Sequence, residues 1–285
     1  QKAYEKLERT GERLYDAVIV DEVQDISQIG LQMIRKCVNG SSDSDRPNGI
    51  LIVGDGAQRI YKHFCSLPDA GINIVGRSTI LRKNYRNREE ILKFAIAVCK
   101  GHEFEDMGSE SNREESIEDF EFGEGQRPKM ISAKSTEDQS KVLIDEVRKL
   151  TKEEFSLSDM LVVTRHRADS MRYRKAFEEN GIPTQDIRDY DGNPSGKISV
   201  GTIYMVKGLE NKICFIPDLT YGEFLPSPKA QEEPDDAYRE RQDNLLNLFW
   251  VAATRPRDRL IMTCVNEPSA WIIERAKGLF DYESS

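Results

Sequence analysis

The stretch that decides the fold is Tyr15-Asp-Ala-Val-Ile-Val-Asp-Glu-Val-Gln-Asp25, where a short apolar run ends in two adjacent carboxylates. The β-branched residues of the run favour a buried strand. Carboxylates directly after such a strand are costly to bury unless a cation or hydrogen bonds compensate them. A magnesium–nucleotide site does so: Asp21 would hold the hydrated Mg²⁺, and Glu22 would orient or deprotonate an attacking water. A helix N-terminus that accepts acidic side chains is the plainer alternative.

Strands and helices alternate outward from this stretch, which predicts an α/β fold class with parallel sheets built from βαβ units. Ligands of such sheets bind at the carboxyl ends of the strands. Residues 222–243 are expected to form a surface loop. Strands are predicted at 15–20, 50–53, 78–81, 129–132, 160–164, 198–202, 212–216 and 260–264, and helices at 26–38, 88–100, 137–150, 167–180 and 244–254.

Two further motifs follow in the first half of the chain. The second predicted strand leads into Gly54-Asp-Gly-Ala-Gln58, a turn that permits close backbone approach and ends in a side chain able to report a terminal phosphate. Next comes Leu81-Arg-Lys-Asn-Tyr-Arg-Asn87, where Arg86 would stabilise a γ-phosphate and Tyr85 would stack on a base. In isolation, the first motif is an ordinary turn and the second a basic surface turn.

Two motifs lie in the second half of the chain. A predicted strand leads into Thr202-Ile-Tyr-Met-Val-Lys-Gly-Leu-Glu210, which contains a polar turn with a buried leucine. A predicted helix ends in Val251-Ala-Ala-Thr-Arg-Pro-Arg257, where the proline limits continuation of the helix. Considered alone, Arg255 is better explained by compensation of the helix C-terminal dipole.

The charge of the chain is concentrated in one segment. Residues 101–125 hold ten acidic residues and one arginine, which accounts for the whole net charge of −9. Such a run is typical of a solvated linker. We therefore expect a first domain at 1–100, an acidic linker at 101–127, a second domain at 128–275 and a tail at 276–285. Because the rest of the chain is near neutral, local basic surfaces for nucleic acid are not excluded.

The composition excludes several classes of protein. The apolar runs are far shorter than the ~20 residues of a membrane span, and the N-terminus lacks the pattern of a signal peptide. Five scattered cysteines and three isolated histidines form no zinc motif. The unpaired spacing of the thiols suits a reducing compartment, which predicts a cytoplasmic protein.

The five motifs, in this order and spacing, closely resemble those of superfamily 1 DNA helicases of the UvrD/Rep family. The resemblance covers nearly the whole chain and implies two RecA-like domains of the P-loop NTPase type, the first of them incomplete. It also implies an ATP-dependent single-stranded DNA translocase or helicase that uses ATP and Mg²⁺. The pathway, DNA repair among others, stays open, as do polarity and the choice of DNA over RNA.

The resemblance also assigns roles to individual residues. Asp21 and Glu22 would serve magnesium and water, and Gln58 would couple hydrolysis to movement. Arg86 and Arg255, from opposite domains, would both grip the γ-phosphate. The remaining implied contacts are to the nucleotide by Tyr85, Gly208 and Glu210, and to single-stranded DNA by Tyr61, His63, Phe64, Thr202 and Tyr204.

Two departures from the family pattern affect function. The family has a histidine where this chain has Tyr204, which keeps base stacking plausible but removes an imidazole hydrogen bond. No G-x-x-x-x-G-K-[ST] loop occurs, so the lysine and amide cradle for the phosphates are missing. We expect the loop to lie upstream of Gln1 and this chain alone to be inactive. A nucleic-acid- or partner-binding module without ATPase activity, or a loop supplied by a partner subunit, are the alternatives.

Overall fold

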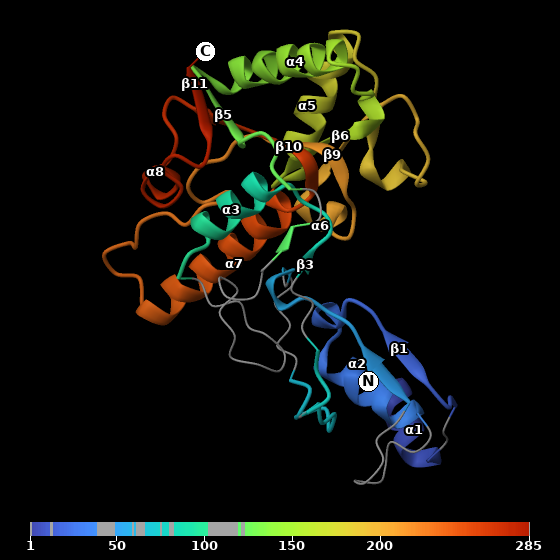
Figure 1. The fold of residues 1–285 in the computed structure, drawn as a ribbon. Helices are drawn as coiled ribbons and strands as arrows, with labels where there is room; N and C mark the ends of the chain where they lie inside the picture. Colours follow the sequence, from blue (N-terminus) through green and yellow to red (C-terminus); the bar gives the residue numbers. More distant parts are fainter. Residues whose placement is uncertain are drawn as a thin grey trace. The chain divides into compact units, whose positions relative to one another are not determined.

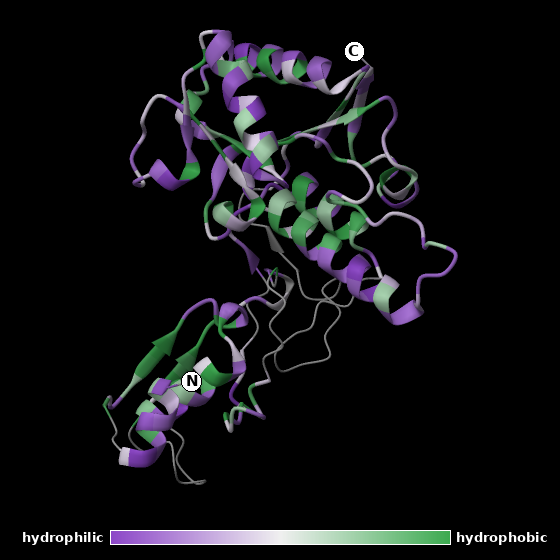
Figure 2. Ribbon diagram, turned by 180° about the vertical axis from the view of Figure 1, so that it is seen from behind, coloured by the Kyte–Doolittle hydropathy of each residue, from purple (hydrophilic) through white to green (hydrophobic). Residues whose placement is uncertain are grey.

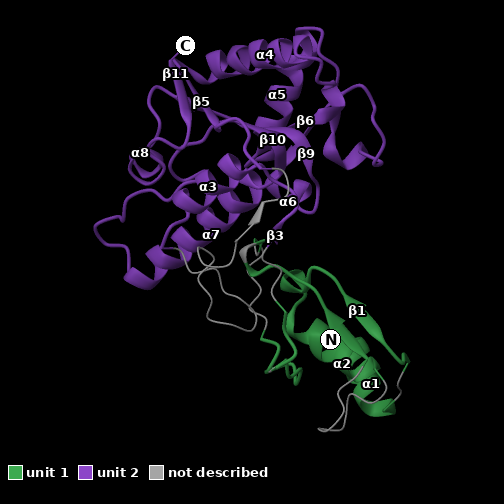
Figure 3. Cartoon of the chain, in the orientation of Figure 1, with its two compact units in different colours: residues 1–81, 103–116 green, residues 82–102, 117–285 purple. Residues whose placement is uncertain are grey.

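The chain forms two compact units, which Figure 3 shows in different colours. The computed structural model describes residues 2–11, 14–38, 49–58, 60, 66–74, 76–79, 83–101, 119–120 and 123–284. Unit 1 comprises residues 1–81 and 103–116, and unit 2 comprises residues 82–102 and 117–285. This division differs from the expected boundary at residue 100, because residues 82–102 group with the second half of the chain. Most of the expected acidic linker lies outside the described residues.

Unit 2 is built on a seven-stranded sheet in which all pairings are parallel. The predicted α/β fold class with parallel sheets is confirmed. The strands lie in the order β11-β5-β10-β9-β6-β8-β7. Their bounds are β5 Lys129–Ala133, β6 Met160–Thr164, β7 Thr184–Asp186, β8 Ile198–Thr202, β9 Asn211–Ile216, β10 Pro256–Val265 and β11 Asp281–Ser284.

Helices cover both faces of this sheet (Figure 1). On one face, α4 (Thr136–Lys152) and α5 (Arg167–Glu179) bury Leu143, Val147 and Phe177 against Val162 and Phe215 of the strands. The other face carries α3 (Glu89–Val98) and α7 (Asp235–Ala253), whose apolar C-terminal half is visible in Figure 2. Because both faces are covered, the strands can be apolar throughout, as β6 is.

Unit 1 has a much smaller sheet. It contains β1 (Val18–Val20) and β2 (Ile50–Ile52), which pair in parallel, with α1 (Lys2–Thr10) and α2 (Gln28–Cys37). Its core gathers Val20, Val23, Leu31, Leu67, Ala70 and Ile72. The outward residues of the strands are also apolar but exposed: Ile19 is 74% exposed and Leu51 is 58% exposed. Figure 2 shows that both strands are hydrophobic.

Several expectations about individual elements need correction. Helix α7 begins at Asp235, so the expected loop at 222–243 ends earlier; Asp235 and Asp236 favour a helix start because they face its positive end. The expected tail contributes β11, which pairs with β5 at the edge of the sheet. Residues 78–79 form no strand, and 80–81 lie outside the described residues. The shorter elements are β3 Lys83–Asn84, β4 Asp119–Phe120, α6 Ile203–Val206 and α8 Ala270–Arg275.

No helix within the described ranges combines the length and the apolar character that a membrane crossing requires.

A buried asparagine holds the start of α3 to the start of β10. Asn87 is 2% exposed, and its Nδ2 donates to the carbonyl oxygens of Thr254, at 3.0 Å, and Pro256, at 2.6 Å. The Arg88 amide adds a bond of 3.0 Å to the Arg257 carbonyl. These bonds join segments almost 170 positions apart, which explains why residues 83–88 belong to unit 2.

Removing this side chain should destabilise unit 2. Asn87→Ala leaves two buried carbonyls without a donor, so we expect a loss of about 2–3 kcal/mol in the free energy of unfolding. Urea unfolding followed by circular dichroism measures it. Asn180→Ala, which removes an exposed bond to Ala176, is the control and should cost about 0.5 kcal/mol or less. Equal losses of unfolding free energy in both variants would contradict the proposed role of the Asn87 side chain.

Candidate functional site

The two strand-end carboxylates lie where the sequence predicts them, directly after β1 in unit 1. Glu22 adopts a left-handed conformation with φ 51° and ψ 44°, which is uncommon for a residue other than glycine. Its amide donates to Asp21 Oδ1 at 2.8 Å. This local bond holds the Asp21 side chain at the end of the strand and offsets part of the backbone strain.

Asp21 could contribute one carboxylate oxygen to a magnesium ion that also binds a nucleotide. The residue is exposed, and among the described residues its second carboxylate oxygen, Oδ2, has no hydrogen-bond partner. The described ranges hold no group of three or more His, Cys, Asp or Glu side chains able to cage a metal ion. Mg²⁺ seldom needs such a cage, because it usually keeps several waters and binds one or two carboxylates plus substrate phosphates.

A buried glutamine connects the two motifs of unit 1. Gln24 is 1% exposed; its Nε2 donates to the Glu22 carboxylate, and its Oε1 accepts from the Asp55 amide at 3.1 Å. Asp55 Oδ2 in turn accepts from Gln58 Nε2 at 2.9 Å. The structure therefore brings Glu22 and Gln58 into one hydrogen-bonded chain.

In unit 2, the turn at residues 84–87 presents its aromatic and basic side chains outward. Asn84 Oδ1 accepts from the amides of Arg86 and Asn87 at 2.9 and 2.8 Å, which fixes the turn. The Tyr85 side chain is 65% exposed, with the Lys83 ammonium 5.4 Å from its ring centroid. Arg86 Nε donates to Glu210 Oε2 at 3.0 Å; the Arg86 side chain is 34% exposed and that of Glu210 is 61% exposed.

Arg255 occupies a different environment. It is fully buried, with Nε donating to the Val251 carbonyl at 2.8 Å and Nη1 to the Leu209 carbonyl at 3.0 Å. The guanidinium thus ties the end of α7 to the turn at residues 207–210. In that turn Gly208 has φ +80°, a conformation that favours glycine although a Cβ would have space.

One expectation about these arginines is wrong. Arg86 and Arg255 do not come from opposite domains, since both lie in unit 2. The physical reason is the Asn87 side chain next to Arg86, which bonds to the carbonyls on either side of Arg255. That the carboxylates of Asp21 and Glu22 and the two arginines bind one and the same nucleotide stays a prediction.

The expected DNA-facing residues of unit 2 lie at the carboxyl end of β8. Thr202 ends the strand, and among the described residues its half-buried hydroxyl has no hydrogen-bond partner. Tyr204 follows on α6, and its hydroxyl accepts from Arg165 Nη1 at 2.6 Å. Arg165 comes directly after β6, which pairs with β8 in register at Thr164 and Thr202.

Sequence reasoning missed two of these residues and named three that stay outside the described ranges. Arg165 could have been identified because it directly follows a predicted strand, and Gln24 because it lies within the quoted DEVQD motif. The hydrogen-bond partners of Arg165 and Gln24 could not be inferred from the spacing of residues in the sequence. Tyr61, His63 and Phe64 lie outside the described residues.

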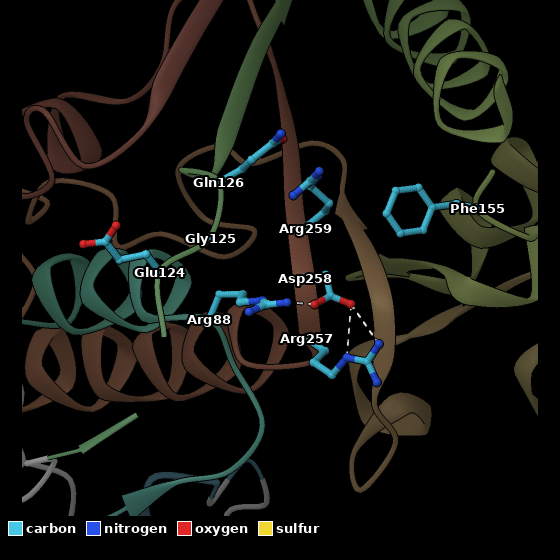
Figure 4. A pocket seen from close by; sticks show the side chains of 8 residues that line it. All are labelled: Arg88, Glu124, Gly125, Gln126, Phe155, Arg257, Asp258 and Arg259. Carbon is cyan, nitrogen blue, oxygen red and sulfur yellow. Dashed lines mark hydrogen bonds and ion pairs between the residues drawn. The ribbon is translucent and has the colours of Figure 1, made fainter. Parts of the chain in front are cut away.

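A surface hollow lies near the start of β10 (Figure 4). Asp258 contacts two of its arginines, Arg88 at 3.2 Å and Arg257 at 2.9 Å. The Arg259 guanidinium carbon lies 5.9 Å from the ring centroid of Phe155, and residues 124–126 complete the lining. Because Asp258 offsets charge on two of the three guanidinium groups, the hollow is only weakly basic.

Comparison with known proteins is consistent with this geometry. Residues 2–66 match the UvrD/REP helicase N-terminal domain family, and residues 79–191 match the UvrD-like helicase C-terminal domain family. The crystal structure of the C-terminal domain of a possible DNA helicase from Lactobacillus plantarum superposes with a TM-score of 0.50 at 14% identity. It covers 70% of this chain and 98% of that one, and it supports the fold alone.

Two curated relatives also match. A DNA helicase II homologue of Mycoplasma capricolum is 32% identical over 120 residues, which is 38% of this chain and 16% of that protein. The TPR and ankyrin repeat-containing protein 1 of Homo sapiens is 27% identical over 255 residues, 84% of this chain and 7% of that protein. The chain thus spans a small part of either relative. The two domain families, together with the DNA helicase II homologue, show that this chain belongs to the UvrD/Rep-type superfamily 1 helicases.

Proposed function

We propose that this chain is the motor portion of an ATP-dependent translocase or helicase that acts on single-stranded DNA. The observation that carries the proposal is the hydrogen-bonded chain from Glu22 through Gln24 and Asp55 to Gln58. It links the carboxylate expected to activate water with the side chain expected to detect a phosphate. A module that only binds nucleic acid has no use for this link.

Unit 1 would bind the magnesium–nucleotide complex. Asp21 has an exposed carboxylate oxygen to contribute, and Mg²⁺ offsets the charge of the nucleotide phosphates. Glu22 would hold or deprotonate the attacking water. The left-handed backbone at Glu22 turns the chain sharply after β1. We propose that this turn lets the neighbouring carboxylates of Asp21 and Glu22 serve different roles.

In unit 2, Arg86 is well placed to change partner. Its ion pair with Glu210 is solvent-accessible, and such pairs contribute about 0–1 kcal/mol, so exchanging Glu210 for a phosphate costs little. Arg255 is held by main-chain carbonyls and would have to leave them to reach a phosphate. Tyr85 offers an exposed ring for stacking on the base.

The track for the nucleic acid would cross the carboxyl ends of β6 and β8. The Thr202 hydroxyl and the Arg165 guanidinium are suited to phosphate oxygens, and Tyr204 offers a ring for stacking. Directed stepping would then follow from conformational changes driven by the binding and hydrolysis of ATP.

The open face of unit 1 supports the expectation that a further segment completes the nucleotide site. Parallel sheets are normally covered on both faces, whereas Ile19 of β1, Leu51 of β2 and Val53 directly after β2 are at least 50% exposed. We propose that this face packs against a segment that carries the phosphate-binding loop. Without that loop, the described residues lack the amide cradle that phosphoryl transfer requires.

The role of Glu22 can be tested in full-length natural protein. Glu22→Gln keeps the shape of the side chain but removes the base, so kcat for DNA-stimulated ATP hydrolysis should fall about 100-fold or more. Steady-state release of phosphate measures it. Glu5→Gln, an exposed position on α1, is the matched control and should behave as wild type. Unchanged turnover in Glu22→Gln would refute the assignment.

Replacing Arg255 should lower the free energy of unfolding much more than replacing Arg86. Arg255→Ala removes a fully buried side chain and two donors, which should cost about 3 kcal/mol or more in unfolding free energy. Arg86→Ala should cost less than about 1 kcal/mol. Urea unfolding compares the two. If Arg86→Ala retains full ATP turnover in the full-length protein, its contact with the γ-phosphate is excluded.

Arg165 should contribute to the salt dependence of DNA binding. If Arg165→Ala removes one phosphate contact, the slope of log affinity against log salt concentration should become shallower by about 0.7–1. Fluorescence anisotropy with labelled oligothymidylate at several salt concentrations measures the slope. Arg148→Ala, an exposed arginine on α4, serves as the charge-matched control. A slope equal to that of the control would remove Arg165 from the track.

A further inference from the structure

The buried side chain of Gln24 has a contact pattern that filling space does not explain. Both ends of its amide are engaged by different segments: the Glu22 carboxylate after β1 and the Asp55 amide after β2. Glu22 can only accept, and the Asp55 N–H can only donate. A side chain between them has to donate on one side and accept on the other, which a glutamine amide does and a carboxylate does not.

The neighbouring backbone is shaped to admit this amide. A Cβ built on Gly54 would lie 2.6 Å from Gln24 Oε1 and 2.6 Å from Val23 Cγ1, closer than real Cβ atoms approach. The main chain also closes on both sides, with Val23 N donating to Val53 O at 3.1 Å and Val53 N donating to Val20 O at 2.8 Å. Gln24 is therefore confined to one position between the two strand ends.

The contact continues to the expected phosphate-sensing residue. Asp55 is bonded twice to Gln58, by its carbonyl oxygen to the Gln58 amide at 2.9 Å and by Oδ2 to Gln58 Nε2 at 2.9 Å. A displacement of Gln58 would therefore move Asp55. The Asp55 amide donates to Gln24, and the other end of the Gln24 amide donates to Glu22, so Glu22 would move as well. Buried amides have few alternative partners, so such a displacement is transmitted along the chain.

We infer that Gln24 is a positioning residue that sets the Glu22 carboxylate and makes its position depend on Gln58. This inference rests on the proposed function, because Glu22 and Gln58 acquire their roles there. Because Gln24 is only 1% exposed, it would act on the Glu22 carboxylate and not on the nucleotide directly. Through Gln24, a movement of Gln58, which is expected to detect phosphate, would change the position of Glu22, which is expected to activate water.

Two readouts in full-length natural protein test the inference. In Gln24→Met, which keeps the length but loses both hydrogen bonds, amide hydrogen exchange of Asp55 should rise about tenfold or more. The kcat for DNA-stimulated ATP hydrolysis should fall about tenfold or more, while KM for ATP stays within about twofold. Glu22→Ala should also raise exchange at Asp55, because the chain loses its far anchor.

Gln24→Glu separates the two ends of the amide. It keeps an acceptor for the Asp55 N–H but replaces the hydrogen bond to Glu22 with repulsion between two carboxylates. The kcat should therefore fall as in Gln24→Met, while exchange at Asp55 should rise less than in Gln24→Met and about as much as in Glu22→Ala. This variant also provides a test if Gln24→Met does not fold.

Gln28 offers a matched control within the same unit. Both ends of its amide are also engaged, in this case by the main chain of one residue: Nε2 donates to Ser66 O at 3.2 Å and Oε1 accepts from Ser66 N at 2.8 Å. Gln28→Met should lose comparable hydrogen bonding without changing kcat or the exchange of Asp55.

The outcomes separate the inference from the proposed function. Wild-type kcat together with wild-type exchange in Gln24→Met overturns the inference. So does unchanged exchange at Asp55 in Glu22→Ala, because the chain then transmits nothing. If wild-type protein hydrolyses no ATP, the proposed function fails, whereas the exchange measurements still decide whether Glu22 and Asp55 are coupled through Gln24.

Discussion

The requirement that buried polar groups find partners determines how both units present their charged side chains. In unit 2 the fully buried Arg255 guanidinium donates to the carbonyls of Val251 and Leu209, and the Asn87 amide donates to those of Thr254 and Pro256. An unpaired group at either position would cost far more than a surface ion pair contributes. The turns that carry the exposed residues are therefore held in place by hydrogen bonds from buried side chains to main-chain carbonyls.

Unit 1 follows the same principle with a glutamine. Gln24 is buried between the ends of two parallel strands, and its amide determines how the segment after β1 lies against the segment after β2. In both units the residue that stabilises the arrangement is buried, whereas Asp21, Glu22 and Arg86 are at least partly exposed. Arg255 is the exception, because it is fully buried and is also expected to bind the γ-phosphate.

The two sheets differ in how completely they are covered. Helices on both faces of the seven-stranded sheet allow strands such as β6 to be buried throughout. The two strands of unit 1 are equally apolar, but Ile19 and Leu51 stay exposed on one face. This contrast, rather than the absence of a motif alone, is the physical reason to expect a further segment against unit 1.

The sequence by itself determined the parallel α/β class, most of the strands and helices, and the family, because apolar periodicity and motif order are local properties. It also placed Asp21, Glu22 and Gln58 after strands in unit 1. Only the tertiary structure assigned Arg86 to the same unit as Arg255, set Arg165 beside Tyr204, and gave Gln24 its two partners. Those contacts depend on the path of the chain between distant segments, which no local pattern encodes.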